Sequence, residues 1–350
     1  MFAPYLPRRL ALRLLAAVFS LIATASIAQT PTKIRFVLDW RFEGPAVLFL
    51  MGNSKGYFKD EGLDVTIDSG TGSGATVTRI ASGVYDMGFA DFAAMIEFLG
   101  NNRDNPGARM QAVMMVYEST PAAVIALKKS GITKPSDLNG KTLGAPVFDA
   151  GRKAFPMFVK ANRLDASSIK WQAMDPPLRE TMLVRGDVDA ITGFTFTSLL
   201  NLNARGIKDQ DVVLLKYPDY GVKLYGNVII ASQKLINENP KAVAGFLRAF
   251  VKSARDVLRD PDASIDQVLK VRDPLIDAAI EKRRLRMAIT DSIATKEARA
   301  GNFGTVDESR LRANAAQVAD AFNMKQLPDV DKLFNASFLP SAAERQIFAK

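Results

Sequence analysis

The sequence contains neither cysteine nor histidine. Without cysteine there is no disulfide, no thiolate chemistry and no lipid-anchored N-terminal cysteine. Without histidine there is no imidazole base, so neither a Ser-His-Asp nor a Cys-His arrangement can form. These absences exclude the common nucleophilic enzymes and zinc proteins, and we expect no metal and no cofactor. Stability must come from burial of a core, for which 48% apolar residues are sufficient material.

Long apolar runs are also missing, apart from a short one near the N-terminus. Arg8, Arg9 and Arg13 lead into the apolar residues 14–25, and Ser26-Ile27-Ala28 is a small-x-small cleavage pattern. The run is about 12 residues, below the ~20 that a helix needs to cross a bilayer. We therefore predict a signal peptide over residues 1–28, a periplasmic mature protein and no membrane span after cleavage.

No block of like charge stands out in the rest of the chain. Removing the three signal arginines leaves 43 basic and 37 acidic side chains, a net charge of +6. The densest basic cluster, residues 282–286, has a helical pattern and is interpreted as a solvated helix face. We expect no nucleic-acid partner.

A repeated strand-helix-strand pattern is present. One copy ends in Gly83-Val84-Tyr85-Asp86 followed by a short apolar strand and Gly88-Phe89, and the other in Gly186-Asp187-Val188-Asp189 followed by a similar strand and Gly193-Phe194. Two such units predict an α/β protein with two similar lobes, and a cleft between lobes favours binding of a small molecule.

Alternating and β-rich segments predict strands, and the residues after 240 are predicted to be mainly helical. The expected strands are 34–38, 63–67, 87–90, 113–117, 124–127, 142–145, 169–174, 190–193, 212–215 and 228–231. We place crossings between the lobes near Ser119-Thr120-Pro121 and near the last strand. The predicted division is residues 29–118 with 232–350 for lobe 1 and 119–231 for lobe 2.

Several motifs resemble one protein family. They are Leu38-Asp39-Trp40, the GYFKDEGLDV segment at 56–65, the glycine-serine loop at 69–74, IASGVYDMG at 80–88 and the Gly131-Ile132 to Gly140-Lys141 segment. Together they resemble exported ABC-importer substrate-binding proteins of the NMT1/THI5-like type, over nearly the whole mature chain. The resemblance implies a type II periplasmic-binding-protein fold, two crossing segments, hinge closure on a small ligand, and a membrane permease as partner of a monomeric receptor.

The Leu38-Asp39-Trp40 opening is similar to the pyrimidine branch of this family. That branch usually has a histidine in the first helix after the Asp-Trp pair, whereas this chain has Arg41-Phe42-Glu43-Gly44-Pro45. The pyrimidine synthases of the superfamily use histidine and a cysteine-rich segment. Their absence argues against an enzyme of that self-consuming type.

Candidate ligand residues of lobe 1 stand at strand ends or helix starts, where ligands of open α/β sheets bind. Trp40 and Phe42 offer aromatic surfaces, and Glu43 accepts hydrogen bonds, or else it only favours a helix start. Gly72, Ser73 and Gly74 bring a helix N-terminus to an anion or carbonyl, unless Ser73 is a plain cap. Asp91 is either a ligand contact or an N-cap.

Candidate residues of lobe 2 are Asp149, Arg152, Phe194 and Thr195, with Tyr225 beside the return crossing. Arg152 is suited to gripping an anion bidentately, or it lies in solvent, and Asp149 equally fits a helix cap. The aromatic residues favour a planar pyrimidine-like ligand. Arg152 with Ser73 favours an alkanesulfonate, taurine or carboxylate. An exported enzyme on the same fold and a chemosensor receptor are the remaining alternatives.

Overall fold

The computed structural model describes residues 30–105, 109–326 and 328–348. The predicted signal peptide lies outside these residues. The segment from Thr32 onward is a compact unit. It contains two five-stranded sheets, each made of mixed parallel and antiparallel strands.

The first sheet has the strand order β2-β1-β3-β10-β4. Its strands are β1 (Thr32–Val37), β2 (Leu63–Asp68), β3 (Met87–Asp91), β4 (Met110–Met115) and β10 (Asn227–Ser232). β1 runs parallel to β2 and β3, whereas β10 runs antiparallel to β3 and β4. The alternating sequence of β2 buries Leu63, Val65 and Ile67 and exposes the residues between them, as a one-sided strand should.

The second sheet repeats this order as β7-β6-β8-β5-β9. Its strands are β5 (Ala122–Leu127), β6 (Thr142–Ala145), β7 (Lys170–Ala173), β8 (Ala190–Phe194) and β9 (Val212–Lys216). β6 is parallel to β7 and β8, and β5 is antiparallel to β8 and β9. Every residue of β5 is buried, as expected for a central strand covered on both faces.

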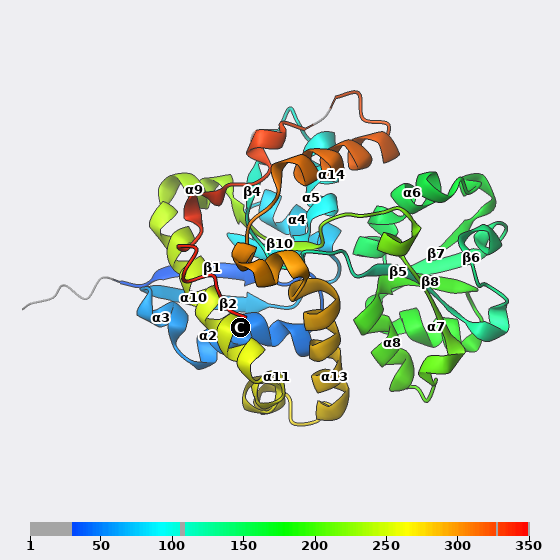
Figure 1. Cartoon of the computed structure of the whole chain (residues 1–350), viewed down its shortest axis with the longest axis horizontal. Helices are drawn as coiled ribbons and strands as arrows, with labels where there is room; N and C mark the ends of the chain where they lie inside the picture. The colour runs from blue at the N-terminus through cyan, green and yellow to red at the C-terminus, as the bar shows by residue number, and fades with distance from the viewer. Residues whose placement is uncertain (1–29, 106–108, 327, 349–350) are drawn as a thin grey trace, which may run out of the picture. The chain divides into compact units, whose positions relative to one another are not determined.

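Helices cover both sheets (Figure 1). They are α2 (Val47–Ser54), α3 (Tyr57–Asp60), α4 (Ser73–Ala81), α5 (Phe92–Asn101), α6 (Ala150–Asn162), α7 (Arg179–Arg185), α8 (Thr195–Asn203), α9 (Gln233–Glu238), α10 (Pro240–Arg259), α11 (Pro261–Ser264), α12 (Lys270–Arg272), α13 (Ala278–Ala288) and α14 (Glu308–Ala321). In α10, Phe246 and Phe250 pack against Phe36 and Phe49 of the first sheet's core, at centroid distances of 5.0 and 4.8 Å. Helix α10 therefore returns to the first sheet.

The two parts of the sequence repeat occupy equivalent places. Gly83 and Gly186 both adopt left-handed φ angles, 75° and 83°, after helices α4 and α7. Each is followed by a strand, β3 or β8, in the middle of its sheet. The prediction of an α/β protein with two similar sheets is confirmed.

The position of β10 differs from the predicted division of the chain. It lies between β3 and β4, so the chain has already returned to the first sheet at Asn227. The predicted boundary at residue 231 falls inside this strand. The apolar pattern identified the strand, but pairing with β3 and β4 is a long-range property that the pattern does not encode.

Candidate functional site

The loops after β1 and before α4 are joined by backbone hydrogen bonds. The Gly70 and Gly72 amides donate to the carbonyls of Trp40 and Asp39, both at 2.8 Å. Gly72 has φ of 130°, and a Cβ atom there would lie 2.4 Å from the Phe148 carbonyl oxygen of the second half. Glycine is therefore required at position 72, because both its backbone conformation and this close approach exclude a side chain.

Two small cavities lie where these loops meet residues of the second sheet. Their volumes are about 30 and 20 Å³. Both are lined by Asp39, Trp40, Phe194 and Thr197. Each has space for one or two water molecules, whereas small-molecule pockets usually measure about 300–1,000 Å³. A ligand must therefore enter with the walls further apart.

Aromatic side chains form one wall. Tyr117, Phe194 and Phe196 pack edge to face, with centroid distances of 5.8 to 6.5 Å. Trp40 stands opposite a guanidinium, since the Arg179 Cζ lies 4.8 Å from the indole centroid. The Trp40 Nε1 atom is buried and has no hydrogen-bond partner among the described residues. An unpaired buried N–H is costly, so this donor is suited to an acceptor on a ligand or a water.

Arg179 is the buried cation of the second half. It is 1% exposed and forms ion pairs with Asp149 at 3.0 Å and Glu180 at 2.8 Å. A Cβ on Gly193 would lie 2.8 Å from the Arg179 Nη1, so this glycine makes room for the guanidinium. Asp149 also caps α6, because its side chain accepts a hydrogen bond from the Arg152 amide. The same carboxylate accepts a hydrogen bond from the Thr192 hydroxyl. Two carboxylates thus share the single Arg179 cation.

Carboxylates outnumber cations around the cavities. Burial raises the pKa of Asp39 to about 7, although its Oδ2 accepts a hydrogen bond from Asn227 at 2.8 Å. Burial also raises the pKa of Glu43, which accepts a hydrogen bond from Thr197 at 3.2 Å and lies 3.4 Å from Arg284. Desolvation dominates both shifts because it penalises the charged form. The site is therefore rich in hydrogen-bond acceptors.

Six of the sequence-predicted residues line one or both cavities: Trp40, Glu43, Gly72, Ser73, Asp149 and Phe194. They come from both sheets, so the structure brings together segments more than 100 residues apart. Their side chains supply the indole, two carboxylates and a hydroxyl. Contact with a ligand remains a prediction for each of them.

The other six lie outside both cavities: Phe42, Gly74, Asp91, Arg152, Thr195 and Tyr225. Asp91 caps α5 by accepting from the Ala94 amide, and its own amide donates to Ser73 Oγ. Arg152 donates to the Ala145 carbonyl and stacks on Trp171 instead of reaching the cavities. The capping alternative describes Asp91, whereas Arg152 packs on Trp171, a role that was not among its predicted alternatives.

Aromatic stacking and burial account for three more of these residues. Phe42 lies under the guanidinium of Arg272, whose Cζ atom is 4.0 Å from the centroid of the Phe42 ring. The Tyr225 hydroxyl accepts from the Asp307 amide, and Arg310 lies 3.9 Å from the Tyr225 ring. Thr195 is buried at the start of α8, where its amide donates to the Pro121 carbonyl.

Asp39, Tyr117, Arg179 and Thr197 line the cavities without having been predicted. Asp39 could have been predicted in the same way as Trp40, because both residues directly follow the first strand. Arg179 stands at the start of α7, shortly after two prolines. The neighbouring sequence does not distinguish it from an arginine on the protein surface. Its role depends on Asp149, 30 residues away.

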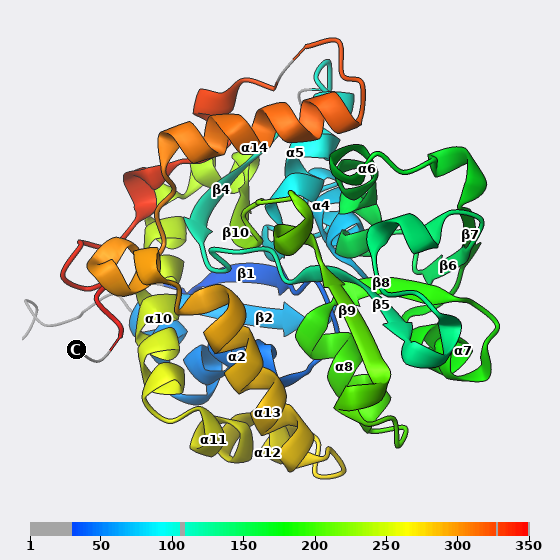
Figure 2. The same ribbon diagram turned by 45° about the vertical axis from the view of Figure 1, so that its right-hand side comes forward.

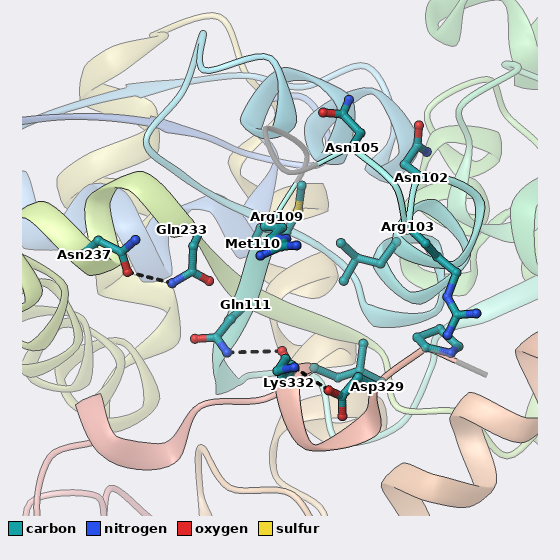
Figure 3. A pocket seen from close by; sticks show the side chains of 13 residues that line it. Asn102, Arg103, Asn105, Arg109, Met110, Gln111, Gln233, Asn237, Asp329 and Lys332 are labelled. Carbon is teal, nitrogen blue, oxygen red and sulfur yellow. Dashed lines mark hydrogen bonds and ion pairs between the residues drawn. The ribbon is translucent and has the colours of Figure 1, made fainter. Parts of the chain in front are cut away.

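A larger hollow of about 560 Å³ lies elsewhere, beside β4 and α9 (Figure 3). Many of its polar side chains are already bonded to neighbours. Gln233 donates to Asn237, Gln111 to the Lys332 carbonyl, and Lys332 pairs with Asp329 at 2.7 Å. It has none of the predicted site residues and no aromatic ring in its lining. Size alone therefore does not make it the binding site.

The described residues hold no group of three or more His, Cys, Asp or Glu side chains arranged to bind a metal ion. Within the same residues, no helix combines the length and apolar character needed to cross a bilayer.

Comparison with known proteins finds curated relatives that match most of the chain. A formylaminopyrimidine-binding protein of Halalkalibacterium halodurans is 26% identical over 266 residues, covering 74% of this chain and 78% of the relative. A 4-amino-5-hydroxymethyl-2-methylpyrimidine phosphate synthase of Aspergillus parasiticus is 26% identical over 261 residues, covering 72% and 74%. The relatives thus include both a binding protein and an enzyme.

Among solved structures, the alkanesulfonate-binding protein SsuA of Xanthomonas axonopodis pv. citri, bound to MOPS, superposes with a TM-score of 0.66. It is 15% identical and covers 86% of this chain and 96% of that one. The likeness confirms the periplasmic-binding-protein fold. The family described as NMT1/THI5 like matches residues 46–264. Because this match covers more than half of the sequence, the chain belongs to the NMT1/THI5-like family.

Proposed function

We propose that this protein is an exported solute-binding receptor that delivers a planar, amino-bearing heteroaromatic molecule of pyrimidine type to an ABC importer. The observation that carries the proposal is the Trp40 indole, which lines both cavities and has a buried N–H without a hydrogen-bond partner among the described residues. Its ring offers a stacking surface and its N–H a donor for a ring nitrogen. The similarity to a formylaminopyrimidine-binding protein supports the same ligand class.

The charge balance favours a hydrogen-bond-donating ligand over an anion. Arg179 is paired with Asp149 and Glu180, and Arg284 with Glu281 and Glu43. Asp39 and Glu43 remain as acceptors whose charge is disfavoured by burial. An exocyclic amino group or a protonated ring nitrogen would satisfy them and favour their charged form, whereas a sulfonate would add a further negative charge and would disfavour it.

A receptor for an alkanesulfonate, taurine or a carboxylate is the second candidate. It is favoured by Ser73 and Gly72, which place the start of α4 at the smaller cavity near Arg179. Backbone N–H groups at a helix start bind anions. One of these groups is already used, because the Gly74 amide donates to the Phe148 carbonyl at 3.1 Å.

We propose binding without chemical conversion of the ligand. Some relatives are named as pyrimidine phosphate synthases, but this sequence has no histidine and no cysteine to serve in acid–base or thiolate chemistry. Export by the predicted signal peptide, a periplasmic location, a monomeric state and docking to a membrane permease belong to the same proposal.

The two tryptophans of the sequence allow a direct test. Trp40 lines the cavities, while Trp171 lies in β7 against Arg152. In a Trp171→Phe variant, binding of 4-amino-5-hydroxymethyl-2-methylpyrimidine should change the fluorescence of Trp40. In a Trp40→Phe variant, the same ligand should leave the fluorescence of Trp171 unchanged and bind at least about tenfold more weakly by calorimetry, as expected for loss of a stacking and hydrogen-bonding partner.

Taurine and an alkanesulfonate provide the competing ligands in a thermal-shift assay. A ligand at 100 times its Kd should stabilise the protein by about 2.7 kcal/mol. Stabilisation by sulfonates alone would establish the second candidate and refute the first. Unchanged pyrimidine affinity in Trp40→Phe would remove the indole from the site. Measured turnover of the pyrimidine would refute binding without conversion.

A further inference from the structure

The basic cluster at 282–286 lies on α13, and its exposed members pair with nearby carboxylates. Lys282 contacts Asp266 at 2.6 Å, Arg286 contacts Asp262 at 2.8 Å, and Arg283 pairs with Asp209. These three pairs are partly or fully open to solvent, and such pairs contribute little to stability. The interpretation of the cluster as a solvated helix face holds for these side chains but not for Arg284, which is 2% exposed.

Arg284 joins elements of the two halves. On its own side it bonds Glu281 at 2.9 Å and 3.1 Å and lies 3.4 Å from Glu43. Toward α8 it donates to the Phe196 and Thr197 carbonyls at 3.1 and 2.9 Å and to Asn201 Oδ1 at 2.9 Å. Figure 2 shows α13 beside α8. The guanidinium is therefore satisfied only while these two helices lie together.

The loop that carries Glu43 is fixed to the same helix. The Gly44 amide donates to Glu281 Oε2 at 2.6 Å, and a Cβ on Gly44 would lie 2.5 Å from the Glu281 carbonyl oxygen. Glu43 in turn accepts from the Thr197 hydroxyl at the start of α8. Both Glu43 and Thr197 line the larger cavity, so the Arg284 contacts continue directly into the candidate site.

Separation of α8 from α13 would have a defined cost. Three donor bonds of a buried cation would be lost, and each loss would leave part of the guanidinium without a hydrogen-bond acceptor. Water entering between the helices would offset part of that cost. The closed arrangement is thus favoured by a contact that lies outside the cavity walls.

We propose that Arg284 is a positioning residue that holds the two halves in the closed arrangement and sets Glu43 and Thr197 at the ligand. This inference rests on the proposed binding function for its ligand-dependent part. Arg284 itself contacts no cavity, so its effect reaches the ligand through the dissociation rate and through the separation of the halves.

The test compares Arg284→Met with Arg283→Met. Both residues are on α13 and both reach residues of α8, because Arg283 donates to Asn203, but only Arg284 is buried. Small-angle scattering of the unliganded proteins should give a larger radius of gyration for Arg284→Met than for Arg283→Met. With 4-amino-5-hydroxymethyl-2-methylpyrimidine as probe, Arg284→Met should release it at least about tenfold faster, equivalent to the loss of one charge-assisted bond, while Arg283→Met should stay within about twofold.

Asn201→Ala provides a milder variant in case Arg284→Met fails to fold. It removes one bond toward α8 and leaves the Arg284 pairs with Glu281 and Glu43 intact. Its release of the probe should be faster than that of the unaltered protein by about three- to tenfold. Equal radii and equal release rates for Asn201→Ala, Arg283→Met and the unaltered protein would overturn the proposal. An increased radius of Arg284→Met in a protein that binds no pyrimidine would refute the proposed ligand and leave the positioning role supported.

Discussion

The two sheets share one scaffold but differ in the electrostatics of their strand ends. Asp86 and Asp189 show the shared part: Oδ2 of each accepts a backbone amide of the neighbouring parallel strand at 2.8 Å, from Arg35 and Thr142 respectively. Each aspartate follows a left-handed glycine by three residues. The aspartates of the sequence repeat therefore encode a structural connection between neighbouring strands.

The difference lies in the buried carboxylates. In the second half, Asp149 has a cation, Arg179, and its pKa is raised by burial against the opposing effect of that charge. In the first half, Asp39 and Asp91 form no ion pair with a described residue, and burial raises the pKa of each to about 7. The scaffold is shared by the two halves of the molecule, while Asp149 on one side of the site is balanced by a cation, and Asp39 and Asp91 on the other side are left to accept protons or hydrogen-bond donors.

The largest expected effect comes from removing the cation that pairs with Asp149 in the second half. Arg179→Met should lower the free energy of unfolding by about 3–5 kcal/mol, because Asp149 and Glu180 would remain buried without their cation. Urea denaturation followed by circular dichroism measures this loss. Arg185→Met on the same helix, where Arg185 is exposed and pairs with Asp187, serves as the control and should change little. Equal small losses for both variants would show that the charge balance around Arg179 is unimportant.

The unpaired carboxyls Asp39 and Asp91 of the first half should make the free energy of unfolding depend on pH. A carboxyl whose folded pKa is about 7 and whose unfolded pKa is about 4 binds more protons when folded, so stability is highest below about pH 4 and falls until about pH 7. Glu118, raised by burial to about 7, acts in the same direction. The chain has no histidine to obscure this range. Between pH 5 and pH 8, each such carboxyl should lower the free energy of unfolding by on the order of 2–3 kcal/mol.

Asp91→Asn isolates one of these groups. Asparagine keeps the helix cap on α5 but does not ionise. The variant should lose less stability than the unaltered protein between pH 5 and 8, as measured by urea midpoints at both values. Asp137→Asn, at an exposed carboxyl whose pKa is lowered by hydrogen bonds, should leave that pH interval unaffected. A flat profile for the unaltered protein would contradict the assignment of raised pKa values.

Glycine substitutions compare the site loop with an open turn. Gly72→Ala should destabilise by about 1–3 kcal/mol beyond Gly56→Ala, because a Cβ at 72 meets the Phe148 carbonyl while nothing lies within 4 Å of one at 56. Gly56 has φ of 75°, so Gly56→Ala measures only the cost of placing an alanine in a left-handed backbone conformation. Thermal unfolding gives both values. Equal losses would indicate that the two halves separate readily enough to accommodate the methyl group.

The smallest effect tests the equivalence of the repeat. Asp86→Ala and Asp189→Ala each remove one carboxylate acceptor of a strand amide, and each should cost about 1–2 kcal/mol. The two losses should agree within about 0.5 kcal/mol in chemical denaturation. A much larger loss at Asp86 would instead assign the main role to its ion pair with Arg35.

Local patterns were enough to place the strands and several helix starts. The alternation of Leu63, Val65 and Ile67 gave β2, and the run at 124–127 lies within β5. The prediction that the residues after 240 are mainly helical shows the limit of such patterns. Leu275 is 95% exposed, and α13 starts only at Ala278, because Asp277 caps it by accepting from the Ala279 and Ile280 amides. Leu275 fitted the apolar period, but the capping side chain determined where the helix begins.

The sequence by itself determined the duplicated α/β scaffold, because strand alternation, glycine turns and the paired aspartates act over a few residues. It also determined what chemistry is missing, since a chain without histidine or cysteine lacks those groups in every fold. Only the tertiary structure decided that Arg179 and Arg284 are buried while Arg283 and Arg152 serve other contacts. An arginine has the same local preferences in each case. Its role depends on carboxylates and carbonyls brought to it from 30 to more than 200 residues away.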